Sequence, residues 1–141
     1  MKVSVLIPLF NEENTIIKIL EKINLEQNKQ KELSFEIIVI NDGSVDNSKK
    51  LLENNTHLYD HLISYDKNQG KGFALREGIK KISGEICLIQ DADLEYLPED
   101  NYNKLLKPFQ NNKADVVYGS RFKGEGSMRV LFFWHMVANK L

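Results

Sequence analysis

The stretch FEIIVINDGS, residues 35–44, decides the fold class of this chain. Its first six residues are almost continuously apolar, which is typical of a parallel strand that is covered on both faces. The apolar run stops at Asn41, and the polar, glycine-containing residues 41–44 predict a turn. A buried strand that leads directly into polar side chains indicates an open α/β sheet with its chemistry at the strand ends.

Four further segments resemble this strand, and helical patterns separate them. We expect strands at 3–9, 35–40, 61–65, 85–90 and 115–118. Apolar residues at helical spacing follow the first and third strands, and Pro98 with two acids behind it predicts another helix start. Alternating strands and helices imply a Rossmann-like, mostly parallel sheet flanked by helices. We interpret the amide-rich residues 24–34 as a surface loop.

Length, composition and charge restrict the class of protein. The chain has 141 residues, enough for one ordinary domain, and its formal net charge of -1 provides no basic field that would attract nucleic acid. No apolar stretch approaches the roughly 18–20 residues that span a bilayer. The single cysteine, Cys87, excludes an internal disulfide, and no signal-peptide pattern follows Met1. These features favour a cytoplasmic location.

Chemically reactive residue types follow the end of every expected strand. Ligands bind beyond the carboxyl ends of the strands in an open α/β sheet, so the five loops are expected to converge on one binding edge. Chance can place polar residues in one or two such loops, whereas all five together indicate a site. In chain order the loops contain Pro8 with Asn11 and Glu12, residues 41–44, residues 68–72, residues 91–93 and residues 119–121.

Asp91 and Asp93 lie two residues apart after an apolar strand, so an extended backbone directs both carboxylates the same way. Two such carboxylates repel each other unless a cation lies between them. Mg²⁺ and Mn²⁺ take oxygen ligands and often combine one or two carboxylates with substrate phosphates. The pattern predicts a metal clamp for a diphosphate, and an acidic turn that caps the next helix is the alternative.

Three other residues are candidates for nucleotide binding. Asp42 could accept an N–H from a nucleobase, although an Asx turn or a helix cap favours the same residue type. Lys71, between two glycines, could reach phosphate, but this segment lacks P-loop spacing, and the first loop lacks the dinucleotide-binding glycine pattern. Arg121 offers a planar fork for phosphate oxygens or, equally well, a surface ion pair.

Together these motifs resemble the family 2 inverting glycosyltransferases, and most of all the branch that makes polyprenyl- and dolichyl-phosphate sugars. The resemblance implies a GT-A fold and a UDP- or GDP-sugar donor. Asn41 stands where the family commonly has a first acid, and Glu95 where the lipid-phosphate branch often has glutamine. The matching segments are VLIPLFNEE (5–13), VINDGS (39–44), NQGKG (68–72), QDADLE (90–95) and GSRF (119–122).

The resemblance also implies roles for the matched residues. Asp93 and Arg121 are expected to be catalytic, because stabilising the charge of a departing nucleoside diphosphate is electrostatic catalysis. The residues expected to hold Mg²⁺ or Mn²⁺ are Asp91, Asp93 and Glu95. Those expected to bind the nucleotide sugar are Pro8, Asn11, Glu12, Asp42, Gly70, Lys71, Asp91 and Arg121.

We therefore expect a metal-dependent hexosyltransferase that works with inversion, with a polyprenyl phosphate as the first choice of acceptor. A lipid phosphate is already ionised near neutral pH and needs no general base, whereas a sugar hydroxyl would need one. A saccharide or cell-wall glycan acceptor, and a donor-binding domain without turnover, are the alternatives. A nucleotidyltransferase would need a glycine- and arginine-rich first loop, which residues 8–14 do not provide.

The last residues differ in character from the rest. We expect residues 1–123 to form the donor-binding domain and residues 124–141 to begin an acceptor-side or membrane-interface segment, because three aromatics stand together at 132–134. The resemblance implies that residues 128–138 touch the membrane surface and that the full-length protein works at its cytoplasmic face. Family members are longer, so we expect a C-terminally truncated domain that binds donor.

Overall fold

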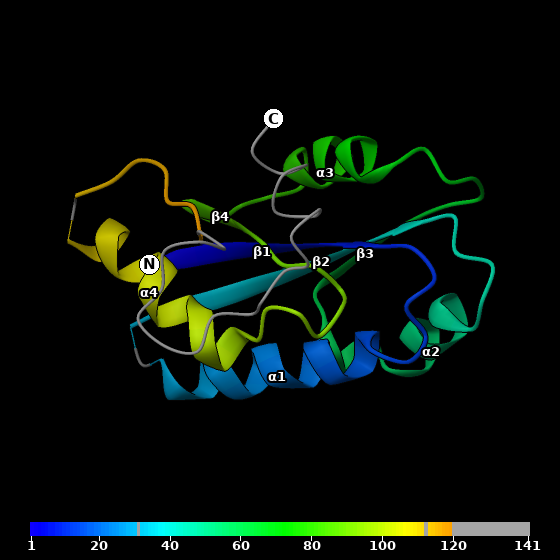
Figure 1. Ribbon diagram of the computed structural model, residues 1–141, viewed down its shortest axis with the longest axis horizontal. Helices are drawn as coiled ribbons and strands as arrows, with labels where there is room; N and C mark the ends of the chain where they lie inside the picture. The colour runs from blue at the N-terminus through cyan, green and yellow to red at the C-terminus, as the bar shows by residue number, and fades with distance from the viewer. Residues whose placement is uncertain (31, 112, 120–141) are drawn as a thin grey trace, which may run out of the picture. The chain divides into compact units, whose positions relative to one another are not determined.

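The computed structural model of this protein describes residues 1–30, 32–111 and 113–119. The chain divides into two compact units, Met1–Tyr102 and Asn103–Leu141, and the sheet belongs to the first. Its four strands are all parallel to their neighbours, in the order β3-β2-β1-β4 (Figure 1). They are β1 (Lys2–Leu9), β2 (Ser34–Asp42), β3 (His61–Tyr65) and β4 (Ile86–Ile89). The predicted α/β class is confirmed.

Helices cover both faces of this sheet. In Figure 1, α1 and α2 lie on one side and α3 lies on the other. The helical segments are α1 (Ile16–Lys29), α2 (Ser48–Asn54), the 3₁₀ turn η1 (Thr56–Leu58), α3 (Lys71–Ile79) and α4 (Pro98–Gln110). The last of them begins at Pro98, as the sequence predicts. No helix within the described part of the chain is long and apolar enough to cross a membrane.

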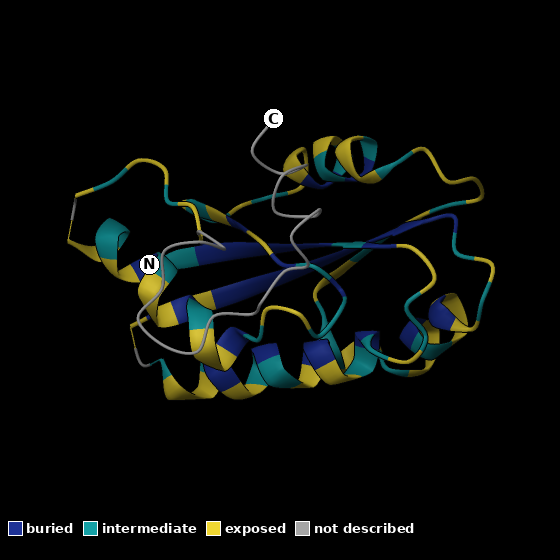
Figure 2. Cartoon of the chain, in the orientation of Figure 1, coloured by how far each residue is buried: buried dark blue, intermediate teal, exposed yellow. Residues whose placement is uncertain are grey.

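The two central strands bury their side chains on both faces. Leu6 of β1 and Ile40 of β2 pack with Ala74 of α3 in one core cluster. Val5 and Val39 are fully buried as well, and they face the α1 layer because successive strand residues point to opposite faces. Figure 2 shows both strands as nearly continuous dark blue. Each such burial contributes roughly 1.5–3 kcal/mol, which explains why an apolar run predicts a central parallel strand.

The expected surface loop at residues 24–34 is wrong over its first half, because α1 continues to Lys29. The polar residues there have hydrogen-bond partners both within the helix and outside it. Asn24 Nδ2 donates to the carbonyl oxygen of Leu20 at 2.8 Å and to that of Leu58 at 3.0 Å. Glu26 is buried and accepts a hydrogen bond from Lys29 Nζ at 3.1 Å. These contacts keep a segment with weak helical patterning in the helix.

The expected fifth strand at residues 115–118 is also wrong, because this segment is irregular in the structure. Val116 and Tyr118 are exposed, so this β-prone segment does not bury one of its faces. A strand is stable only when a neighbouring strand or helix covers it, and the described residues of this unit provide no strand as a partner.

A buried carboxylate ties together the amino-terminal parts of the strands. Glu36 of β2 is 6% exposed. Its Oε2 accepts hydrogen bonds from Ser4 Oγ at 2.6 Å and from the backbone N–H of Ser83 at 2.8 Å, and its Oε1 accepts one from Lys2 Nζ at 3.1 Å. Burial alone would raise the pKa of Glu36, but the hydrogen bonds from Ser4, Ser83 and Lys2 outweigh it and lower the pKa to about 2.

Candidate functional site

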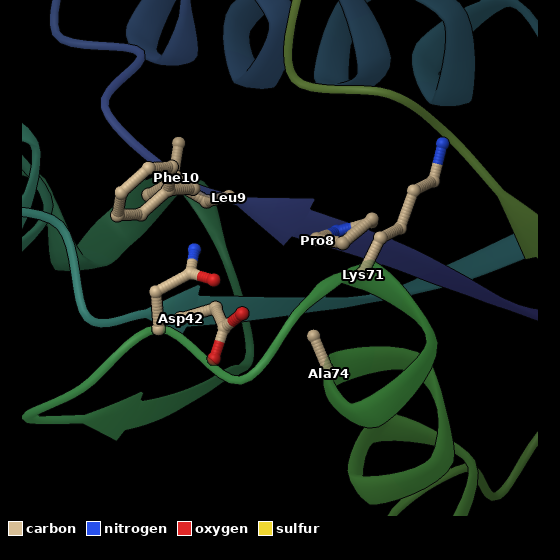
Figure 3. A pocket seen from close by; sticks show the side chains of 7 residues that line it. Pro8, Leu9, Phe10, Asp42, Lys71 and Ala74 are labelled. Atoms are coloured by element: carbon tan, nitrogen blue, oxygen red, sulfur yellow. The ribbon is translucent and has the colours of Figure 1, made fainter.

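The candidate site lies at the carboxyl ends of β1 and β2, beside the first turn of α3. A cavity of about 150 Å³ opens there, and Figure 3 shows the side chains that line it. Three of the predicted donor-binding residues, Pro8, Asp42 and Lys71, are among them. The lining consists of Pro8, Leu9, Phe10, Asp42, Asn68, Lys71 and Ala74. The cavity therefore lies at the edge of the sheet where the sequence predicts ligand binding.

Asp42 ends β2 and is almost completely buried, with 2% exposure. Its Oδ2 accepts hydrogen bonds from the backbone N–H groups of Gln69 at 3.1 Å and Gly70 at 2.7 Å, and its Oδ1 accepts one from Gln69 at 3.0 Å. Asp42 thus anchors the loop that precedes α3. The predicted contact between Asp42 and a nucleobase stays a prediction.

The loop before α3 also passes very close to the turn that follows β2. A Cβ atom on Gly43 would lie 2.5 Å from the backbone nitrogen of Asn68, so any residue other than glycine would clash there. Gly43 and Gly70 have φ angles of 71° and 94°, a region that favours glycine. The glycines of both motifs are therefore required by the backbone, and they hold the loop against the cavity.

An ion pair joins two of the predicted motifs directly. Lys71 Nζ donates to Asp91 Oδ1, which connects the first turn of α3 to the loop after β4. The Lys71 side chain is 55% exposed and that of Asp91 is 34% exposed. Partly exposed pairs contribute only about 0.2–1 kcal/mol, so this contact is one that a charged ligand can displace.

The predicted metal ligands lie in the loop after β4. Asp93 Oδ1 accepts a hydrogen bond from the backbone N–H of Glu95 at 2.9 Å, which makes a local turn. Within the described ranges, no three His, Cys, Asp or Glu side chains are grouped to hold a metal ion. The carboxylates of Asp91 and Asp93 have the oxygen chemistry that Mg²⁺ and Mn²⁺ prefer, and they fit a cation that takes its remaining ligands from a diphosphate. The metal assignment stays a prediction.

Asn11 and Glu12 do not line the cavity, and the donor-binding role that the resemblance implies for them stays a prediction. Asn11 has a φ of 55°, its N–H donates to Ser44 Oγ at 3.0 Å, and its Oδ1 accepts from Val45 N–H at 2.8 Å. Glu12 N–H donates to Ser48 Oγ at 3.0 Å. In the structure these residues fasten the loop after β1 to the loop after β2 and to the first residue of α2.

Asn41, the departure from the family pattern, is a buried structural residue. Its Nδ2 donates to Ser64 Oγ at 3.1 Å, and its Oδ1 accepts from Ser44 N–H at 3.1 Å. Both ends of the amide are therefore used to join β2 to β3 and to close the following turn.

Sequence reasoning missed Phe10, which lines the cavity and is 45% exposed. A large aromatic residue in an otherwise polar loop was the signal that could have identified it. Asn68 and Ala74 line the cavity too, because of the path of the loop and of α3 rather than because of their chemistry. Arg121 and residues 124–141 lie outside the described residues, so the roles expected for them stay predictions.

Comparison with curated proteins finds lipid-phosphate sugar transferases among the relatives. The chain is 38% identical over 102 residues to an undecaprenyl-phosphate 4-deoxy-4-formamido-L-arabinose transferase of Proteus mirabilis, covering 70% of this chain and 31% of that protein. It is 31% identical over 141 residues to a dolichol-phosphate mannosyltransferase of Pyrococcus furiosus, covering 99% of this chain and 39% of that protein. The chain thus spans about a third of the length of these relatives.

Solved structures of glycosyltransferases share the fold. The mannosyltransferase PcManGT from Pyrobaculum calidifontis, in complex with GDP-Man and Mn²⁺, matches 64% of this chain and 27% of its own, with 29% identity and a TM-score of 0.54. The glucosyl-3-phosphoglycerate synthase from Mycobacterium tuberculosis, in complex with Mn²⁺, UDP and glucosyl-3-phosphoglycerate, matches 77% and 39%, with 26% identity and a TM-score of 0.61. TarS 1–349 from S. aureus, at 23% identity over 88% of this chain and 40% of its own with a TM-score of 0.65, shows the fold alone.

The predicted GT-A architecture is therefore confirmed by solved neighbours, and the resemblance read from the motifs is confirmed by the sequence family. The family model described as Glycosyl transferase family 2 matches residues 4–134, which include the strand ends, the cavity and the loop after β4. The chain belongs to glycosyl transferase family 2.

Proposed function

We propose that this chain is the donor-binding part of an enzyme that transfers a sugar from a UDP- or GDP-sugar to a polyprenyl or dolichyl phosphate. The observation that carries the proposal is the cavity at the strand ends, which Asp42 and Lys71 both line and from which Lys71 extends to Asp91. The curated relatives named above carry lipid phosphates in their names, and two solved neighbours contain GDP-Man or UDP.

The cavity walls suit a nucleoside. Pro8 and Ala74 offer apolar surface, and the half-exposed ring of Phe10 offers a face on which a base can stack. Asp42 receives three hydrogen bonds from two loop amides, while an ionised carboxylate has about four acceptor sites. One N–H of a nucleobase can therefore be accepted in addition.

The positive charges suit a diphosphate. Lys71 lies between the cavity and the loop after β4, and in this proposal Arg121 adds a second cation on the phosphates. Asp91 and Asp93, with Glu95 beside them, would hold Mg²⁺ or Mn²⁺. A cation bound there would stabilise the charge of the departing nucleoside diphosphate. An ionised phosphate acceptor would need no general base from this chain.

Donor binding tests the proposal. UDP, GDP, UDP-glucose and GDP-mannose would be titrated into the folded chain by calorimetry, with and without Mn²⁺. We expect one of these nucleotides to bind in a metal-dependent way, with a loss of at least about tenfold in Asp93→Ala. Asp100→Ala, which removes an exposed carboxylate from α4, is the matched control and should bind like the wild type. If the folded chain binds none of these nucleotides under either condition, the proposal is wrong.

The acceptor is tested by transfer of labelled sugar to a polyprenyl phosphate, with a saccharide acceptor as the competing choice. We further propose that residues 1–123 bind the donor and that residues 124–141 lead to the acceptor side, with residues 128–138 against the cytoplasmic face of a membrane. The adjacent aromatic residues at 132–134 support this last point, and sedimentation of the chain with anionic lipid vesicles, with and without residues 124–141, tests it.

A further inference from the structure

The loop of residues 67–71 physically links the two halves of the candidate site. Its backbone rests on Gly43, where the closest approach leaves no room for a side chain. Its amides at Gln69 and Gly70 are held by Asp42. Its last residue, Lys71, pairs with Asp91 across the site. The loop thus joins the side chain nearest the proposed base position to the first acid of the proposed metal loop.

The two ends of this link differ in strength. Asp42 is almost fully buried and receives three hydrogen bonds from backbone amides, so its end of the loop is fixed. The Lys71–Asp91 pair is partly exposed and involves one flexible side chain, so it can exchange partners at small cost. A diphosphate in the cavity would present Lys71 with an oxygen anion of the same chemical type as the one it already contacts.

On the basis of the function proposed above, we propose that Lys71 is a shared counter-ion that transfers from Asp91 to the donor diphosphate when a nucleotide binds. Nucleotide binding then releases the Asp91 carboxylate for a divalent cation. Conversely, a cation on Asp91 releases Lys71 for phosphate. The two ligands therefore favour each other through this pair, and thermodynamic linkage requires the effect to be equal in both directions.

Metal-free nucleotide affinity isolates this exchange from direct contacts between metal and phosphate. UDP and GDP would be titrated with a chelator present and followed by NMR of the backbone amides. The variants are Asp91→Asn, Lys71→Met and the double variant that combines them. Asp93→Asn is the matched control, because it removes the same charge two residues further on and releases no lysine.

We expect Asp91→Asn to bind metal-free nucleotide about 1.5- to 5-fold more tightly than the wild type, which is the range of an exposed ion pair. Asp93→Asn should change the affinity less. The gain should vanish when Lys71 is already Met, which a double-mutant cycle measures directly. In the reciprocal experiment, Mn²⁺ alone should bind more tightly to Lys71→Met than to Lys67→Met, since Lys67 is exposed and forms no ion pair with the described residues.

The inference is overturned if Asp91→Asn binds metal-free nucleotide no more tightly than the wild type, if Asp93→Asn gains as much, or if the gain persists with Lys71→Met. Nucleotide binding with Mn²⁺ by the wild type alongside any of these results leaves the proposed function standing. If no variant binds nucleotide even with Mn²⁺, although circular dichroism shows a folded chain, the proposed function fails and this inference fails with it.

Discussion

Protonation of Glu36 should destabilise the fold at acidic pH by an amount that can be worked out from its surroundings. The folded-state pKa is lowered from 4.5 to about 2. A lowered pKa means that the ionised form is the one the fold stabilises, so this contribution is complete above about pH 4.5 and is lost as the pH falls towards 2. At 1.36 kcal/mol for each pKa unit, the contribution is about 3 kcal/mol, of which about 2 kcal/mol are gone by pH 3.

Glu36→Gln removes the charge without much change in size. At pH 7 it should lower the free energy of unfolding by about 3 kcal/mol, because the donors of Ser4, Ser83 and Lys2 would then face a neutral amide in place of a carboxylate. The difference between variant and wild type should then shrink by about 2 kcal/mol as the pH is lowered to 3. Urea unfolding followed by circular dichroism at several pH values from 3 to 7 measures both quantities.

Glu21→Gln provides the control, because Glu21 is an exposed carboxylate on α1. Its unfolding free energy should stay within about 0.5 kcal/mol of the wild type at every pH. A difference between Glu36→Gln and wild type that stays constant from pH 3 to 7 would refute the reasoning, because the carboxylate would then contribute through packing alone. A loss below about 1 kcal/mol at pH 7 would refute it as well.

Three further changes test the site and the core. Gly43→Ala should cost at least about 2 kcal/mol in thermal unfolding and weaken nucleotide binding, because its Cβ would meet the Asn68 backbone and φ is 71°. Asp42→Asn should speed hydrogen exchange at the Gln69 and Gly70 amides and weaken nucleotide binding about tenfold or more, and unchanged exchange would contradict the anchor role. Tyr102→Phe should leave the free energy of unfolding unchanged or raise it by up to about 1 kcal/mol, because the buried hydroxyl has no hydrogen-bond partner in the described part of the chain. If urea unfolding instead shows a destabilisation of more than about 1 kcal/mol, the hydroxyl has a partner and this reasoning is wrong.

The strands could be predicted because their burial follows local rules. Residues 61–65 form β3 as predicted, and the predicted strand at 3–9 agrees with β1 to within one residue. Both segments combine β-prone residues with polar breaks at their ends. The predicted strand at 115–118 has the same local signal, but its fate depends on a partner edge, which no window of sequence contains.

The position of the candidate site could also be predicted, because parallel strands bring their carboxyl ends to one edge. The pairings inside it could not. Asp42 contacts amides 27 and 28 residues away in sequence, and Lys71 pairs with a carboxylate 20 residues away. Spacing along the chain carries no information about such contacts. Glu36 was missed for a related reason, since a single acid within an apolar run gives no sign of the donors from Ser4, Ser83 and Lys2 that offset the cost of its burial.

Glu36 and Asp91 differ in what they can do because they differ in burial and in the number of groups that hold them. Glu36 is 6% exposed, and donors from Ser4, Ser83 and Lys2 occupy both of its oxygens, so a ligand could bind it only by breaking these hydrogen bonds. Asp91 is one-third exposed and holds a single flexible ammonium. A contact that must be exchanged during binding has to be weak, and a contact that maintains the sheet has to be strong. The structure places the strong contact at the amino-terminal part of the strands and the exchangeable one at the carboxyl ends, where an open parallel sheet binds its ligands.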